Sequence, residues 1–437
     1  MTAARDGESF DPRTGLPASE LRALKQRTTW YVLAREYIEQ RWDRTPGNTR
    51  RTLADAFAAI TPALVESGAA YRHPRVLRRA LHSWAFDKNA WKSEPAEEWH
   101  EALAWLKWNS LPVSELEDPD TLRRALDALC RKLDGTTAAA KTVKRKRAAV
   151  NEVFGVAVER GYFTHNPLSG LRWTAPEVAD EVDPDCVPNP AQVTRLLAAV
   201  RELPGRGPHL YGFFACVYYA AMRPAEVIHL RKAQCRRPAT GWGLLNLKGG
   251  VVNAGKEWTD DGSVHEIHSL KRRAAKATRP VPVPPVLVRI LREHIGQFGT
   301  APDGRIFRNA KGNYIDAAAY GITWNRAREA ALTLDEHAVE LAKRPYGLRH
   351  AGISFWLASG VDPAECARRA GQSIQVLFRH CAKFLAEARA TPTGSSRTPC
   401  GAGTASRKPM RAYRGLLARN GPGTAGRGWD TGGMNRE

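Results

Sequence analysis

Apolar residues recur at helical spacing through the first third of the chain. The region from Thr28 to Gly161 predicts five helices, over residues 30–42, 50–67, 97–108, 120–133 and 140–160. Asp120 is placed to cap the fourth helix, and Gly135 follows its end. The tryptophans of this region are better explained by a small helical core than by stacking on nucleic-acid bases. The pattern predicts a helical domain over 28–173 after a disordered N-terminus over 1–27.

The pattern changes in the second half of the chain. Gly-Leu-Leu-Asn-Leu at 243–247 and Arg-Pro-Val-Pro-Val at 279–283 predict short strands that flank a polar loop. Helices are predicted around them, over residues 191–203, 209–222, 285–298, 317–332, 349–359, 363–370 and 374–388. The fold class predicted is therefore mainly α with a small β-sheet, an α+β domain over 188–387 following the helical one. An acidic, proline-containing linker occupies 174–187, and residues 388–437 form a low-complexity tail expected to be disordered.

The net charge of the chain indicates the class of molecule that it binds. The 437 residues include 66 Lys and Arg against 45 Asp and Glu, a formal net charge of +21. The tail contributes +7 and the remaining +14 belongs to segments that look folded. Such an excess favours a polyanion, most simply nucleic acid, although a basic protein from an arginine-rich proteome is the plain alternative.

Cysteine usage and hydropathy exclude other classes. The seven cysteines are scattered and no pair has C-x-x-C spacing, so neither a zinc site nor a disulfide framework is expected. No other metal and no cofactor are expected. The N-terminus lacks the apolar core of a signal peptide, and the longest mostly apolar stretch is too short to span a bilayer. We expect a cytoplasmic, nucleoid-associated protein with no membrane partner.

One basic cluster lies on a helix that also has a packing face. The candidate DNA contacts on this helix are Lys141, Lys144, Arg145, Lys146 and Arg147. Apolar positions follow at Val150, Val153 and Phe154, so the charges sit on a helix that is anchored in a core. A run of charge is usually a solvated face, but this anchoring favours a surface that follows phosphates.

Three further segments resemble, in order and spacing, the conserved boxes of tyrosine recombinases, the family of phage-type integrases. Ala220-Ala-Met-Arg223-Pro-Ala-Glu226 resembles the first arginine box. Tyr346-Gly-Leu-Arg349-His350 resembles the second, usually written H-x-x-R. Gly371-Gln372-Ser373 with Cys381 nine residues after Gln372 resembles the third, usually G-H-S followed by the nucleophilic tyrosine. The resemblance covers about residues 28 to 387.

This resemblance implies a helical core-binding domain over 28–173 and a catalytic-type domain over 188–387 that bind duplex DNA at attachment-like sites. It implies strand exchange, as in the integration of a mobile element, by a homo-tetramer on DNA. Arg223 and Arg349 would clamp a phosphate, because guanidinium groups make paired, charge-assisted hydrogen bonds to its oxygens. A lysine on the hairpin, Lys271 with Lys276 as the alternative, would be either the general acid or a phosphate contact. Neighbouring DNA contacts would come from Arg272 and Arg273.

The sequence departs from the family pattern at three positions. Tyr346 replaces a histidine, and its phenol still donates a hydrogen bond. Gln372 also replaces a histidine and cannot shuttle a proton. Cys381 stands at the position of the nucleophilic tyrosine, where a thiol is several Å shorter than a phenol. A working thiolate and an inert cysteine are both open, so whether the chain is an enzyme is open too.

Two functions therefore compete. The first is site-specific recombination through a covalent protein–DNA intermediate. The second is a pseudo-recombinase that binds DNA without cutting it, and a decayed gene copy would fit that interpretation. A basic helical protein with no nucleic-acid function would make the three spaced boxes a coincidence.

Overall fold

The computed structural model of the chain describes residues 9–12, 15–177, 183–270, 274 and 277–378. These residues divide into two compact units. Unit 1 comprises the described residues up to 177 together with the internal segment 253–266, and unit 2 comprises the rest. Both are rich in helices, and strands are short and antiparallel, so the predicted fold class, mainly α with a small β-sheet, is confirmed.

Unit 1 is built almost wholly of helices. They are α1 (Ala18–Arg27), α2 (Trp30–Arg41), α3 (Gly47–Ile60), α4 (Pro74–Ala80), α5 (Glu97–Asn109), α6 (Pro119–Leu129) and α7 (Ala140–Glu159). The five predicted helices are present, but the second runs over Gly47–Ile60 rather than 50–67 and continues only as a short 3-10 turn, Thr61–Ala63. The helical pattern also missed α4, a short helix that begins at Pro74.

The N-terminal segment was expected to be disordered over 1–27, and the described part of it contains helix α1. The physical reason lies in the charges at its two ends. Glu20 stands in the first turn, and Lys25 and Arg27 stand in the last, which complements the helix dipole. Leu21 and Leu24 give the helix its few apolar positions.

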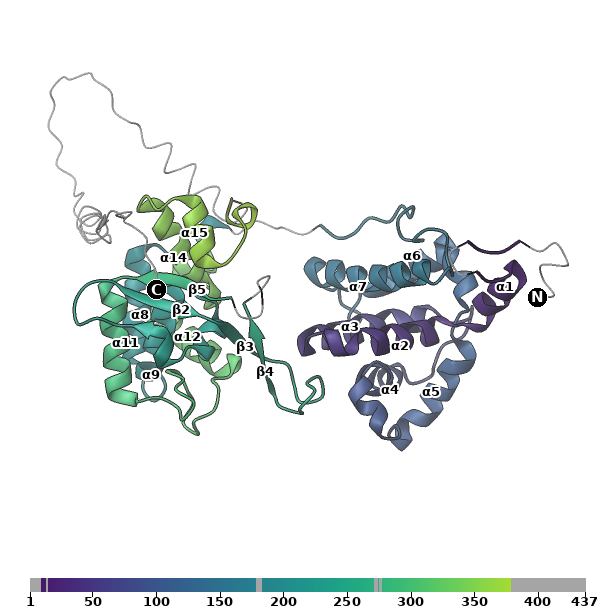
Figure 1. Ribbon diagram of the computed structural model, residues 1–437, viewed down its shortest axis with the longest axis horizontal. Helices are drawn as coiled ribbons and strands as arrows, with labels where there is room; N and C mark the ends of the chain where they lie inside the picture. The colour runs from purple at the N-terminus through teal and green to yellow at the C-terminus, as the bar shows by residue number, and fades with distance from the viewer. Residues whose placement is uncertain (1–8, 13–14, 178–182, 271–273, 275–276, 379–437) are drawn as a thin grey trace, which may run out of the picture. The chain divides into compact units, whose positions relative to one another are not determined.

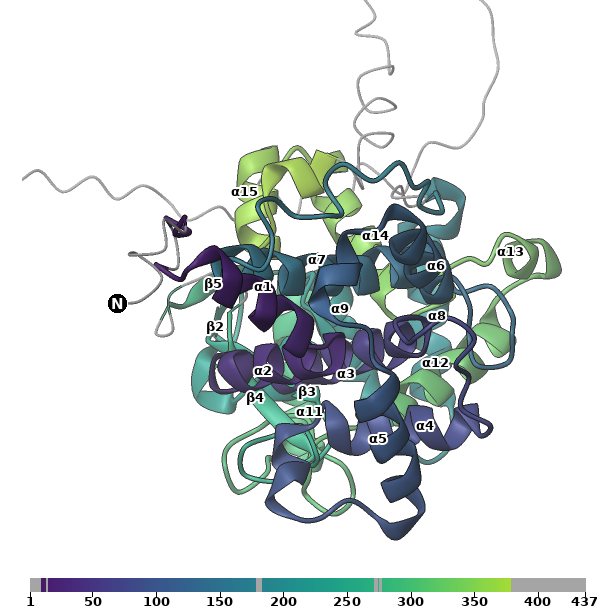
Figure 2. The ribbon, with the colours of Figure 1, turned by 90° about the vertical axis from the view of Figure 1, so that its right-hand side faces the viewer.

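The core of unit 1 is aromatic. Trp30, Phe57 and Phe86 are fully buried. Their rings meet edge to face, with centroids 6.0 Å apart for Trp30 and Phe57 and 5.5 Å apart for Phe57 and Phe86. Helices α2, α3 and α7 lie side by side around this core, with α4 and α5 on one flank (Figures 1 and 2).

Five further tryptophans, at positions 84, 91, 99, 105 and 108, lie close together in the sequence, and they do not all belong to that core. Trp84, Trp91, Trp99 and Trp105 are partly buried against it. Trp108, at the end of α5, is 85% exposed. The core interpretation therefore holds for four of the five.

Unit 2 combines a small sheet with many helices. The helices are α8 (Pro190–Glu202), α9 (Gly207–Tyr219), α10 (Pro224–His229), α11 (Pro285–Phe298), α12 (Ala317–Ala331), α13 (Leu334–Ala338), α14 (Tyr346–Ala358) and α15 (Pro363–Ala370). The strands are β1 (Cys235–Arg236), β2 (Gly243–Leu247), β3 (Gly249–Asn253), β4 (His265–Ser269) and β5 (Arg279–Val283). Strands β3 and β4 pair with each other, and the 253–266 segment between them belongs to unit 1.

The three-stranded sheet has the order β1-β2-β5, and Figure 1 shows it among the helices of unit 2. Strand β5 is antiparallel to β2, with Arg279 opposite Leu247 and Val283 opposite Gly243. An outer strand tolerates Pro280 and Pro282, since prolines lack the N–H that a central strand needs. Alternation along β5 points Arg279, Val281 and Val283 inward, where all three are buried. An arginine thus occupies a core-facing position.

Candidate functional site

Arg223 stands where α9 has ended and α10 begins. Its backbone N–H donates to Oε2 of Glu226 at 2.8 Å, and its Nη1 donates to Oε1 of the same carboxylate at 2.9 Å. Its Nη2 donates to the carbonyl of Gly371 at 2.6 Å. The Arg223 side chain is 24% exposed, so it combines a fixed position with access to solvent.

Arg349 lies on α14 and is fully buried. Its Nη1 donates to the carbonyl of Ala221, and its Nη2 donates to the carbonyl of Ala370 at 2.7 Å. Ala221 has a φ of 45°, a left-handed conformation that is strained for alanine, and this residue presents its carbonyl to the guanidinium. Burial lowers the pKa of Arg349 to about 10, so the group stays charged at neutral pH.

Gln372 follows the left-handed Gly371 that ends α15. Its Oε1 accepts from Nη2 of Arg349 at 3.3 Å. Because a guanidinium only donates, the amide must turn its oxygen toward Arg349, and its NH₂ group is directed elsewhere. Gln372 can therefore accept from an arginine and donate to a ligand, as a neutral histidine would, but it cannot carry a proton.

Tyr346 is the first residue of α14 and is 39% exposed. The Cζ atom of Arg349 lies 5.7 Å from the centroid of its ring, within the range of a cation–π contact. Of the six residues expected at the catalytic site, the structure brings Arg223, Arg349, Gln372 and Tyr346 into one connected group. Lys271 and Cys381 lie outside the described residues, as do Arg272, Arg273 and Lys276.

The sequence interpretation missed a second buried arginine at this site. Arg279 donates from Nη1 and Nη2 to the two oxygens of Glu226, at 2.8 and 2.7 Å. Burial alone would raise the pKa of Glu226, but Arg279, Arg223 and Arg349 together lower it below its usual value. A carboxylate surrounded by three arginines stays ionised, and the site keeps a net positive charge. The one available signal was an arginine at an inward position of an alternating strand.

The basic residues of α7 lie in unit 1. Lys141, Lys144 and Arg145 are exposed, and Lys146 and Arg147 are half-buried. Burial, and then the charge of Arg78, lowers the pKa of Lys146. The exposed members give this helix a cationic face while Val150, Val153 and Phe154 on the other side are buried.

A groove of about 520 Å³ runs along the same helix. Its lining includes Lys144, Arg147 and Asn151 of α7 and Trp173 from the segment that follows. The Cζ atom of Arg147 lies 5.8 Å from the Trp173 ring centroid, and Trp173 donates from its indole nitrogen to Asp127 at 2.9 Å. Cationic groups are suited to phosphates, and an aromatic ring is suited to stacking on bases.

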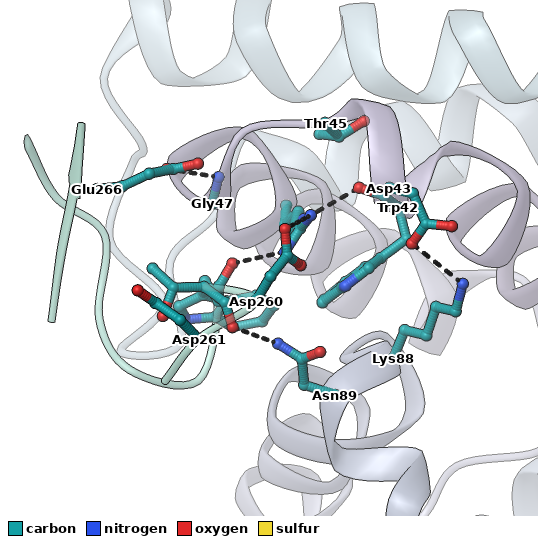
Figure 3. Close-up of polar contacts among 12 residues, drawn as sticks. Trp42, Asp43, Thr45, Gly47, Lys88, Asn89, Asp260, Asp261 and Glu266 are labelled. Carbon is teal, nitrogen blue, oxygen red and sulfur yellow. Dashed lines mark hydrogen bonds and ion pairs between the residues drawn. The ribbon is translucent and has the colours of Figure 1, made fainter. Parts of the chain in front are cut away.

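The 253–266 segment forms a second polar cluster in unit 1 (Figure 3). Arg50 of α3 is 3% exposed and donates to the carbonyl of Trp258 at 3.0 Å and to both oxygens of Asp260 at 2.6 and 3.2 Å. Asn89 donates from its side chain to the carbonyls of Glu257 and Thr259, each at 2.9 Å. The segment is therefore bound through backbone carbonyls and through the side chain of Asp260.

Three more contacts complete this cluster. The backbone N–H of Gly47 donates to Oε2 of Glu266 at 2.9 Å (Figure 3). Trp258 is 4% exposed, and its ring centroid lies 6.3 Å from that of Trp42 and 5.2 Å from that of His82. A tryptophan from a segment far along the chain thus completes the core of the first unit.

Within the described ranges, no group of three or more His, Cys, Asp or Glu side chains is placed to hold a metal ion. Over the same part of the chain, no helix is both long and apolar enough to cross a membrane.

No protein-family model matches this chain, and no curated protein matches it. Solved structures do resemble it. The Tn1549 transposon integrase in complex with transposon right end DNA has a TM-score of 0.49 and 15% identity, over 77% of this chain and 97% of that one. The XerH site-specific recombinase bound to palindromic difH substrate has a TM-score of 0.47 and 12% identity, over 79% of this chain and 96% of that one. A lambda integrase dimer bound to a core site has a TM-score of 0.40 and 12% identity, over 65% of this chain and 85% of that one. These structural neighbours are tyrosine recombinases and integrases.

Proposed function

We propose that this chain is a DNA-binding protein of the tyrosine-recombinase type, which holds duplex DNA and contacts one phosphate through Arg223 and Gln372, while Arg349 holds the turn on which Gln372 lies. The proposal rests on one observation: Arg223 and Arg349 both bind the turn formed by residues 370–372. Arg223 donates to Gly371 and Arg349 donates to Ala370 and Gln372, although the first arginine lies 148 residues from that turn. Helical periodicity alone requires no such meeting.

The three groups divide the work. Arg223 is partly exposed and has donors beyond those given to Glu226 and Gly371, so it makes the direct phosphate contact. Arg349 is buried and holds the carbonyls of Ala221 and Ala370 in place. A phosphate reaches Arg349 directly only if residues 370–372 move. Gln372 presents its NH₂ group to the same phosphate because its oxygen is held by Arg349.

The DNA backbone is engaged over a longer path by the exposed lysines and arginine of α7 in unit 1 and, in this proposal, by Lys271, Arg272, Arg273 and Lys276. The core-binding role of residues 28–173 and the catalytic-type role of 188–387 belong to the same proposal, as do attachment-like sites, a tetramer on DNA and the integration of a mobile element. Strand cleavage is not expected to be efficient, because Cys381 and Gln372 replace the nucleophile and a proton carrier.

A salt series tests the binding proposal. Fluorescence anisotropy of a labelled duplex is measured from 50 to 300 mM salt, and log K should fall linearly with log salt, by about 0.9 for each phosphate contacted. Lys141→Ala with Arg145→Ala should lower that slope, whereas Lys107→Ala, an exposed lysine on α5 of the same unit, should leave it unchanged. A flat salt dependence for the unmodified chain contradicts the proposal.

A denaturing gel tests the chemistry. The chain is incubated with a nicked, labelled duplex, which traps a covalent protein–DNA adduct. Little or no adduct is expected from the unmodified chain, and more from Cys381→Tyr combined with Gln372→His than from either change alone. A strong adduct from the unmodified chain that Cys381→Ala abolishes would make the cysteine a nucleophile and the chain an active recombinase.

A further inference from the structure

The carboxylate of Glu226 is held by two arginines with different access to solvent. The Arg279 side chain is 2% exposed and binds both of its oxygens, whereas the Arg223 side chain is 24% exposed and binds one through Nη1. The Glu226 side chain itself is 6% exposed. Arg279 therefore fixes the orientation of Glu226, and Glu226 in turn receives Arg223.

Arg279 also packs against Gly371, the residue whose carbonyl accepts the second hydrogen bond from the guanidinium of Arg223. Gly371 has a φ of 65°, and a Cβ atom built on it would lie 2.3 Å from Nη1 of Arg279. The carbonyl of the same Gly371 accepts from Nη2 of Arg223 at 2.6 Å. One buried guanidinium thus packs against both groups that position Arg223.

Stability alone gives little reason for a buried ion pair at this place. The alternation of β5 puts Arg279 where Val281 and Val283 fill the core, and a buried ion pair is often no better than apolar residues of similar volume. Among the described residues its Nε has no hydrogen-bond partner, a further cost. A buried ion pair that adds little stability over apolar residues, and that orients a functional arginine, is best explained by that orientation.

We infer that Arg279 is a positioning residue that holds Glu226 and Gly371 so that the guanidinium of Arg223 faces the phosphate. The inference rests on the proposed function, since it assumes that Arg223 contacts DNA. Without Arg279, each oxygen of Glu226 loses one hydrogen bond, and Oε2 keeps only the one from the backbone N–H of Arg223. Both oxygens can then also accept from the guanidinium of Arg223, because a carboxylate and a guanidinium pair in a two-pronged fashion. Arg223 then turns toward Glu226, and its phosphate contact is lost.

The salt slope of DNA binding measures this contact without any cleavage. Arg223→Ala should lower the slope by about 0.9, the value for one phosphate. Arg279→Met should lower it by the same amount, although Arg279 is too buried to touch DNA. Arg279→Lys keeps the charge but cannot bind both oxygens in parallel, so it should lower the slope too.

The double variant Arg223→Ala with Arg279→Met gives the most decisive test. If Arg279 acts through Arg223, the double variant lowers the salt slope of DNA binding no more than Arg223→Ala alone does. Arg305→Met is the matched control, because Arg305 is another buried arginine of unit 2 that pairs with an acid, Asp303, at 2.7 Å and has no contact with Arg223 or Glu226. It should lower the melting temperature and leave the slope unchanged.

The outcomes are separable. A wild-type slope in a folded Arg279→Met or Arg279→Lys protein, while Arg223→Ala loses its contact, overturns the positioning role alone. Additive losses in the double variant overturn it as well, since Arg279 would then act independently of Arg223. If Arg223→Ala itself leaves the slope unchanged, the proposed phosphate contact fails first.

Discussion

Replacing Gly371 by alanine probes how tightly the site is built. The residue has φ 65° and ψ 49°, and a left-handed alanine costs roughly 1–2 kcal/mol. The added Cβ would lie 2.3 Å from Nη1 and 2.9 Å from Cζ of Arg279, where ordinary contact begins at 3.4 Å. The guanidinium must therefore retreat by about 1 Å from a position fixed by bonds of 2.8 and 2.7 Å to Glu226.

That displacement weakens a buried ion pair whose complete loss costs about 3–5 kcal/mol. We expect Gly371→Ala to lower the free energy of unfolding of unit 2 by about 3 kcal/mol or more, the sum of the backbone cost and part of the ion pair. Urea denaturation of the full chain, followed by hydrogen exchange of peptides from α14 and α15, reports on this unit separately.

Gly360 provides the matched control. It has a φ of 85° in the turn after α14, and a Cβ built on it would meet nothing within 4 Å. Gly360→Ala should therefore cost only the backbone term, roughly 1–2 kcal/mol. Equal losses for the two alanine variants would refute the reasoning, because Arg279 would then be able to move aside freely.

Three other predictions concern pH and the 253–266 segment. Burial lowers the pKa of His294 to about 4, so the stability that its neutral form contributes is present above pH 6.5 and lost as pH falls toward 4, by roughly 3 kcal/mol. His294→Gln should flatten that part of the urea-midpoint profile. Burial raises the pKa of Asp87 to about 6, so its contribution is present below pH 4 and lost as pH rises past 6. Asp87→Asn should stabilise unit 1 at pH 7 by up to roughly 3 kcal/mol and give no gain at pH 4; equal effects at both pH values would contradict this. Arg50→Met should increase hydrogen exchange in residues 253–266, and an unchanged rate would mean that the backbone contacts of Asn89 suffice.

Periodicity predicted most helices because their apolar faces are local features of the sequence. Helices α2, α5, α7 and α11 begin and end within one residue of the predicted positions. Strands β2 and β5 were predicted at their observed bounds. Helix α13 was missed because it is five residues long and has no buried side chain, so no apolar face marks it.

The site was less accessible to sequence reasoning. Arg223, Arg349 and Gln372 were selected by resemblance, and periodicity gave no reason to bring them together. Arg279 escaped notice because alternation normally fills an inward strand position with an apolar residue, and only its contact with Glu226 explains the exception. The pairing of Arg50 with Asp260 joins residues 210 apart, and no local pattern encodes such a contact.

The place of the 253–266 segment sets the order in which the chain can fold during synthesis. The last helix of unit 1, α7, ends at Glu159, so Trp258 and Asp260 join the unit only after the 101 residues from Arg160 to Asp260 have been synthesised. At roughly 5–20 residues per second, the pocket around Trp42 and Arg50 waits several seconds for them. A fragment that stops before residue 253 would lack them, and the exposed indole of Trp42 and the buried guanidinium of Arg50, without its partner Asp260, would favour aggregation. Expression of unit 1 by itself should therefore require the segment to be supplied as a fused or separate peptide.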